Sequence, residues 1–128
     1  MTKIELTLAV EHGVMFLHGA GEGVSIPDDT GVKNISITEN CVSFRVKTYV
    51  DGDAIVELGD PSISNFEEQE YFSGSINCMS KSISLSDSYG FVYASLPLDA
   101  EIAAISIKMS EAENPDWVKC IVHNLASF

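Results

Sequence analysis

Hydrophobic side chains recur at every second position along much of this chain. In residues 4–10, Ile4, Leu6 and Leu8 alternate with more polar neighbours, and residues 42–50 repeat the pattern. Successive side chains of a β-strand point to opposite faces, so this period predicts half-buried strands. Residues 79–86 are the clearest case, because four serines alternate with Met79, Ile83 and Leu85. We predict nine or ten strands, over residues 4–10, 14–18, 34–38, 42–50, 54–58, 71–78, 79–86, 91–96, 102–109 and 117–125.

Turn residues separate these segments at short intervals. Asp51-Gly52-Asp53 lies between two apolar runs and is typical of a β-hairpin. Further turns are expected at residues 59–62, 86–90 and 114–116. We therefore predict one all-β domain over residues 1–128, an antiparallel β-sandwich or open barrel. Residues 62–71 are the best place for one short helix, with Ser64 as its N-cap and Glu67 three residues later.

Composition narrows the class of protein and of partner. The chain has 128 residues, of which 45% are hydrophobic, and its formal net charge is −12. The hydrophobic content is too high for a disordered acidic tail. The net charge is too negative for direct binding to nucleic acid or to an anionic membrane. We see no secretory signal pattern and no long apolar span, and expect a cytoplasmic protein. The cysteines are expected to be buried thiols without zinc or redox chemistry, namely Cys41, Cys78 and Cys120.

No motif for catalysis, metal binding or cofactor binding stands out. His12 and His18 are six residues apart, which is not a usual ligand spacing, although two histidines on adjacent strands could still meet. Residues 19–23 are rich in glycine but lack the spacing of a phosphate-binding loop. A calcium loop that began at Asp51 would need glutamate at its twelfth position, where Ser62 stands. We expect no enzyme, no cofactor and no resident metal, although the many carboxylates leave a hydrolase open.

Charge distribution is the most informative feature. Residues 48–80 contain no lysine or arginine but seven acidic residues. Such a surface would steer a basic protein toward it, and aromatic neighbours would supply buried anchors. The plainer interpretation is that the charge only keeps the protein soluble. The predicted partner-binding residues are Asp51, Asp53, Glu57, Asp60, Phe66, Glu67, Glu68, Glu70 and Tyr71.

A family resemblance points the same way. The segment at residues 75–86, SINCMSKSISLS, followed by the turn at residues 87–90 and the strands after it, resembles the bacterial competence-nuclease inhibitors. The chain's size and acidity are also similar to those of toxin immunity proteins. The resemblance implies a non-catalytic inhibitor that binds one toxin nuclease in the cytosol.

We therefore predict an immunity or inhibitor protein that neutralises a cognate basic toxin, a nuclease, by covering its active site with an acidic surface. The alternative is a β-sandwich module that binds a small ligand or glycan. The two functions require different surfaces. An inhibitor needs an acidic face beside apolar anchors, and a ligand-binding module needs a concave face with exposed aromatic residues.

Overall fold

Ten β-strands make up nearly all the regular structure of this protein. The computed structural model describes residues 2–21, 23–28 and 33–126. The two short 3₁₀ helices are η1 (Tyr49–Asp51) and η2 (Pro61–Ile63). Each of the ten predicted segments overlaps one strand. The strands are β1 (Lys3–Leu8), β2 (Val14–Gly19), β3 (Ile35–Ile37), β4 (Cys41–Arg45), β5 (Ala54–Gly59), β6 (Glu70–Asn77), β7 (Ser82–Asp87), β8 (Val92–Pro97), β9 (Ile102–Met109) and β10 (Trp117–Val122).

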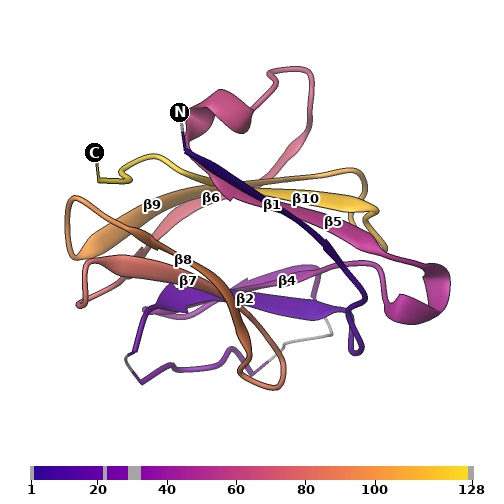
Figure 1. Ribbon diagram of the computed structural model, residues 1–128, viewed down its shortest axis with the longest axis horizontal. Coiled ribbons are helices and arrows are strands. Elements are labelled where there is room, and N and C mark those ends of the chain that lie inside the picture. The colour runs from indigo at the N-terminus through magenta and orange to yellow at the C-terminus, as the bar shows by residue number, and fades with distance from the viewer. Residues whose placement is uncertain (1, 22, 29–32, 127–128) are drawn as a thin grey trace.

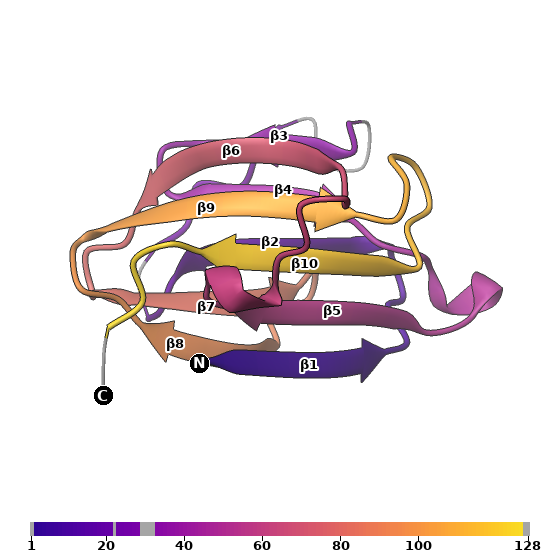
Figure 2. The ribbon, with the colours of Figure 1, turned by 90° about the horizontal axis from the view of Figure 1, so that it is seen from above.

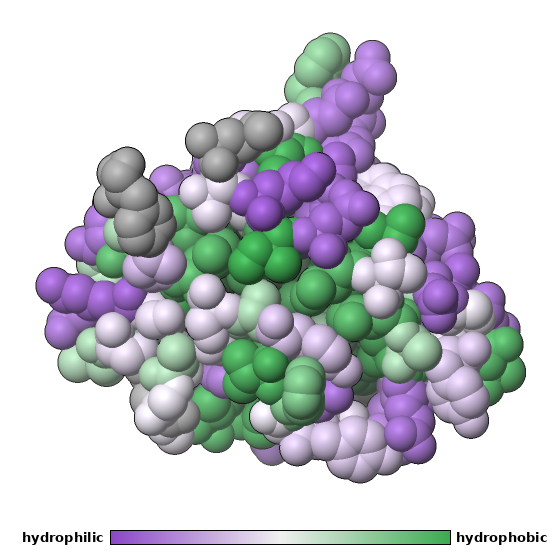
Figure 3. All heavy atoms as spheres, viewed as in Figure 1, coloured by the Kyte–Doolittle hydropathy of each residue, from purple (hydrophilic) through white to green (hydrophobic). Residues whose placement is uncertain are grey.

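The strands form two five-stranded sheets that pack face to face (Figure 1). Sheet 1 has the order β1-β5-β10-β9-β6 and sheet 2 the order β3-β4-β2-β7-β8. Among the described strands, β1 pairs only with β5 and β8 only with β7. The two sheets are therefore not joined along the side where β1 and β8 are the edge strands. Hydrophobic side chains are visible on this side of the molecule in Figure 3. The predicted sandwich is confirmed, and the architecture is not a closed barrel.

Alternating side chains of both sheets fill the space between them. Val56 and Leu58 of β5 face Leu17 of β2 and Leu85 of β7 across one continuous core, and all four are fully buried. Burial of this apolar surface is the main force that holds the two sheets together. All three cysteines are free and buried, as predicted. Burial raises the pKa of the Cys41 thiol to about 12, so it stays protonated at neutral pH.

One strand pair departs from the antiparallel pattern. β10 runs parallel to β5, with Trp117 beside Ile55, while every other pair of named strands is antiparallel. Parallel neighbours need a long connection, and here residues 60–116 lie between them. β10, the last strand, therefore lies between β5 and β9 in sheet 1. It pairs with one strand from the first half of the sequence and one from the second half.

The Asp51-Gly52-Asp53 turn does not form the predicted hairpin. β4 belongs to sheet 2 and β5 to sheet 1, so the segment carries the chain from one layer to the other. η1 and Gly52 make this change of direction, and Gly52 has a φ of 116°, which favours glycine. The turn residues were recognised correctly, but a turn signal does not say whether the next strand pairs with the previous one.

The predicted helix at residues 62–71 is wrong. Only Pro61–Ile63 form a single 3₁₀ turn, and its N-cap is Asp60, whose side chain accepts a hydrogen bond from the Ser62 amide at 2.9 Å. The capping geometry therefore sits four residues earlier than predicted. The last two residues of the predicted helix belong to β6, and Phe66 is 92% exposed. Among the described residues, no helix is long and apolar enough to cross a membrane.

The predicted strand at residues 79–86 begins later than expected. Lys81 has a φ of 57°, and its amide donates to the Cys78 carbonyl at 2.9 Å, so residues 78–81 form a turn and β7 starts at Ser82. β6 carries a bulge between Glu70 and Phe72.

Candidate partner-binding surface

The connection between β5 and β6 crosses the outer face of sheet 1. We call residues 60–69 the strap. Because β10 and β9 lie between β5 and β6, the strap must pass over both of them, as Figure 2 shows. It carries four of the nine predicted partner-binding residues, and two more follow it at the start of β6. The strap is therefore where the sequence-based prediction can best be compared with the geometry.

Two lysines from the sheet below hold the strap in place. Lys119 of β10 donates from Nζ to the Ile63 carbonyl at 3.0 Å and to both carboxylate oxygens of Glu68 at 3.0 and 2.8 Å. Lys108 of β9 donates to the Asn65 carbonyl at 2.8 Å. The strap therefore has fixed attachment points at both of the strands that it crosses.

A small turn at the middle of the strap presents its exposed residues. The Asn65 amide donates to Glu68 Oε1 at 3.0 Å, and the Glu67 amide donates to Asn65 Oδ1 at the same distance. These two bonds close a loop around Phe66. The apolar ring therefore projects into solvent from a turn whose backbone is held on both sides.

Glu57 lies beneath the strap and is not available at the surface. It is 9% exposed, with Oε1 3.5 Å from Lys3 Nζ and Oε2 4.0 Å from Lys119 Nζ. Burial raises its pKa, the neighbouring Glu5 adds to this, and the two lysines oppose it. Its Oε2 has no hydrogen-bond partner among the described atoms. Glu57 is thus an internal charge that depends on its lysine neighbours.

Two further predicted acids are engaged within the fold. Burial pushes the pKa of Glu68 upward, but the hydrogen bonds from Lys119 and Asn65 and the charge of Lys119 outweigh it, so the pKa is lowered. Hydrogen bonds from the Ser62 side chain and from the Thr2 and Ser62 amides lower the pKa of Asp60 to about 2. Both carboxylates therefore serve as attachment points for the strap.

The remaining predicted residues fall into two separate places. Phe66, Glu67 and Glu70 are exposed on and beside the strap, and we call these three residues the strap tip. Tyr71 is half-buried and packs against the core. Asp51 and Asp53 lie at and just after η1, at the opposite end of β5 from the strap. The nine residues thus do not form one patch, and the strap tip is the part that faces outward together. Figure 3 shows hydrophilic side chains gathered on the upper rim, over the strap.

Sequence reasoning missed Lys108 and Lys119, the residues that organise this surface. Each lies on the outward side of a strand whose inward residues are wholly apolar, and Lys108 is only 8% exposed. A single lysine within an apolar strand needs a partner when it is buried. That signal was present in the sequence, but it could not identify the partners, which are two backbone carbonyl groups and the Glu68 carboxylate of a distant loop.

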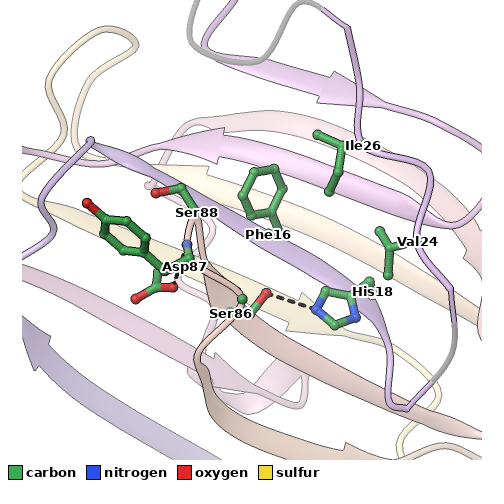
Figure 4. A pocket seen from close by; sticks show the side chains of 9 residues that line it. Phe16, His18, Val24, Ile26, Ser86, Asp87 and Ser88 are labelled. Atoms are coloured by element: carbon green, nitrogen blue, oxygen red, sulfur yellow. Dashed lines mark hydrogen bonds between the residues drawn. The ribbon is translucent and has the colours of Figure 1, made fainter.

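A hollow on the outer face of sheet 2 is another feature that sequence reasoning missed. It has a volume of about 410 Å³ and is lined by Phe16 and His18 of β2, Val24 and Ile26 of the next connection, and the β7–β8 turn (Figure 4). β2 is apolar on both faces, which is the usual sign of a strand covered on both sides. We call this space the apolar hollow.

His18 and Ser86 form a hydrogen-bonded pair at the base of the apolar hollow. His18 Nδ1 lies 2.9 Å from the Gly19 carbonyl oxygen, so in the neutral ring it carries the proton, and Nε2 accepts from Ser86 Oγ at 2.8 Å. A serine and histidine at this distance resemble a nucleophile and base. However, the nearby amides of Tyr89 and Phe91 both donate to Asp87, so they are not free to stabilise an oxyanion. The described residues contain no group of three or more potential metal ligands.

Comparison with known proteins adds one fold relationship. No protein-family model and no curated protein sequence matches the chain. Its fold is similar to the crystal structure of ComJ from Bacillus subtilis, an inhibitor of the DNA-degrading activity of NucA. The TM-score is 0.66 at 10% sequence identity, and the match covers 97% of this chain and 96% of ComJ. The fold implied by the resemblance of residues 75–86 to competence-nuclease inhibitors is therefore confirmed.

Proposed function

We propose that this protein binds a cognate nuclease toxin in the cytoplasm and inhibits it by covering its active site. The observation that carries the proposal is the fold shared with 96% of ComJ, an inhibitor of the DNA-degrading activity of NucA. A net charge of −12 supports it independently, because a nuclease must attract a polyanionic substrate into a basic channel. An acidic protein is complementary to that channel.

We assign contact with the nuclease to the strap tip. Phe66 combines 92% exposure with a turn that is hydrogen-bonded on both sides, which suits an aromatic anchor. Glu67 and Glu70 lie beside it, where they take the place of DNA phosphates. Asp51 and Asp53 lie at the other end of β5, so we place them at the periphery of the proposed interface.

The first step of the test is to identify the partner. A pull-down from the native host at low and then raised salt supplies the candidate, and DNA degradation by that protein is measured with increasing amounts of inhibitor. Loss of activity at a one-to-one ratio is the expected result. A partner without nuclease activity, or a nuclease that stays active with excess inhibitor, would overturn the proposal.

Matched variants then test the assignment of the surface. Glu67→Lys combined with Glu70→Lys should weaken inhibition by at least about tenfold, since close charge pairs contribute more than about 1.4 kcal/mol. Phe66→Ala should weaken it by about 30-fold, the effect of losing one anchor of about 2 kcal/mol. The control is Glu39→Lys with Glu101→Lys, the same change in net charge at exposed positions near the β6–β7 turn. Equal losses for both charge-reversed pairs would mean that net charge alone acts.

A further inference from the structure

Two adjoining cavities flank Tyr89 on the side of the β7–β8 turn. The apolar hollow lies on one side of this residue. On the other side is a smaller cavity of about 150 Å³, lined by Glu11, Asp87, Ser88, Tyr89 and Tyr93, which we call the acidic notch. Tyr89 is 67% exposed; its hydroxyl lies 2.9 Å from His12 Nε2 and its ring centroid 5.3 Å from that of His12, and the rest of the ring is open to a partner from outside.

The apolar hollow is suited to a large apolar side chain. Phe16 forms its floor and is 6% exposed, while Ile26 on its wall is 52% exposed. The polar pair at its base, His18 and Ser86, is already hydrogen-bonded internally. An apolar group can therefore enter without leaving these polar atoms unsatisfied. Exposed bulky apolar residues around such a cavity are typical of a binding site.

The acidic notch is suited to a cation. The Asp87 carboxylate accepts hydrogen bonds from the amides of Tyr89 and Phe91 and from the Tyr93 hydroxyl, at 2.9, 3.0 and 3.1 Å. All three donors are neutral, so the negative charge remains. Among the described residues, neither Glu11 nor Asp87 is in a salt bridge. Burial raises the pKa of Tyr89, and the charge of Glu11, its hydrogen bond with Tyr89 and the charge of Asp87 raise the pKa further, which agrees with a negative potential here. Two tyrosine rings and two carboxylates form a favourable environment for an ammonium or guanidinium group.

We propose that this face binds a protein segment in which an arginine or lysine stands next to a large apolar side chain. The apolar side chain occupies the hollow, the cation occupies the notch, and Tyr89 lies between them. This site is on sheet 2, whereas the strap tip is on sheet 1, so it is a second recognition surface and goes beyond the proposed inhibition of a nuclease.

The test uses short peptides and the intact protein, with backbone amide shifts followed by NMR. The probe is acetyl-Gly-Arg-Leu-Gly-amide, compared with one peptide in which citrulline replaces arginine and another in which alanine replaces leucine. We expect saturable shifts for Phe16, Gly90 and Glu11, and weaker binding of both altered peptides. Because an exposed charge pair contributes up to about 1 kcal/mol, the citrulline peptide should bind up to about fivefold more weakly.

Protein variants separate the two cavities. Glu11→Gln leaves the Asp87 carboxylate in place, so it should lower binding of the arginine peptide only part of the way toward that of the citrulline peptide, and Ile26→Ser should weaken both peptides alike. Both positions are exposed, and Glu67→Gln on the strap is the matched control that should change nothing. Three results would overturn the inference: no saturable shifts, equal affinity for the arginine and citrulline peptides, or tighter binding of neutral sugars in the hollow. None of them depends on whether the strap tip inhibits a nuclease.

Discussion

Replacing Lys119 with methionine tests the physical account of the strap. The variant keeps the apolar stem of the side chain but removes its charge. It deletes the hydrogen bonds from Nζ to the Ile63 carbonyl and to both oxygens of Glu68, and the ion pair with Glu57. Glu57, which is nearly buried, then keeps only Lys3 as a cationic neighbour.

The expected loss of stability follows from these contacts. A hydrogen bond to a charged group contributes about 1.5–3 kcal/mol, and removal of one partner of a buried ion pair costs about 3–5 kcal/mol. The side chains of Lys119 and Glu68 are still 19% and 18% exposed, so water recovers part of the lost interaction. We therefore expect the free energy of unfolding to fall by about 2–3 kcal/mol.

Calorimetry and urea unfolding at pH 7 measure this loss. An unfolding entropy of about 2.1 cal/mol/K per residue means that each kcal/mol lowers the Tm by about 4 °C for a chain of this length. The Tm of Lys119→Met should therefore fall by about 7–11 °C.

Lys108→Met is the matched control, because Lys108 Nζ donates to the neutral Asn65 carbonyl and forms no salt bridge among the described residues. Its Nζ is also a charged donor, but the variant loses one hydrogen bond and leaves no carboxylate without its partner, so its loss should be smaller, about 1.5 kcal/mol. A second comparison adds Glu68→Gln to Lys119→Met, which removes the carboxylate left without its lysine and should restore part of the stability. If Lys119→Met were no less stable than Lys108→Met, the charged attachment would not hold the strap.

Two further predictions concern the ends of the strap. The pKa of Asp60 is lowered from 3.8 to about 2, so its folded form binds fewer protons than the unfolded chain in that range, and stability should be lost as the pH falls from 3.8 toward 2. Urea unfolding across this window should show a flatter pH dependence for Asp60→Asn, and identical slopes would contradict the assignment. A Cβ at Gly59 would lie 2.5 Å from the Thr2 carbonyl oxygen, whereas at Gly74 it would meet only the movable ring of Phe72. Thermal unfolding should therefore show a loss of about 1–3 kcal/mol for Gly59→Ala and a change within about 0.5 kcal/mol for Gly74→Ala, while equal losses would refute this reading.

The strands could be predicted because their hydrophobic period reflects a local property. In β9, Ile105, Ile107 and Met109 face the core while Lys108 faces outward, and this alternation is visible without knowledge of any neighbour. The helix at residues 62–71 failed for the opposite reason. Ile63 packs beside Gly59 and Phe66 faces solvent, so their helical spacing does not reflect one shared face.

The candidate site could be predicted in its charge but not in its arrangement. A run of acids without lysine or arginine predicted an acidic segment, and Glu67 and Glu70 are exposed on and beside the strap. It could not show that Glu68 would be paired with Lys119, which is 51 positions away in sequence. Ion pairs of this kind depend on which strand lies beneath a loop, and the parallel placement of β10 beside β5 was itself not expected. The acids that remain available for a partner are therefore a smaller set than the sequence suggests.

The acids within the strap divide between two roles that support each other. Glu68 and Asp60 fix the backbone, and Glu67 remains exposed at its apex. Ordering a loop on binding costs about 1–2 kcal/mol per residue in conformational entropy, and that cost is subtracted from the affinity. A strap that is already attached to Lys108 and Lys119 loses less entropy when a partner binds. In the complex proposed above, Glu68 and Asp60 would therefore contribute to affinity by holding Phe66 and Glu67 in place.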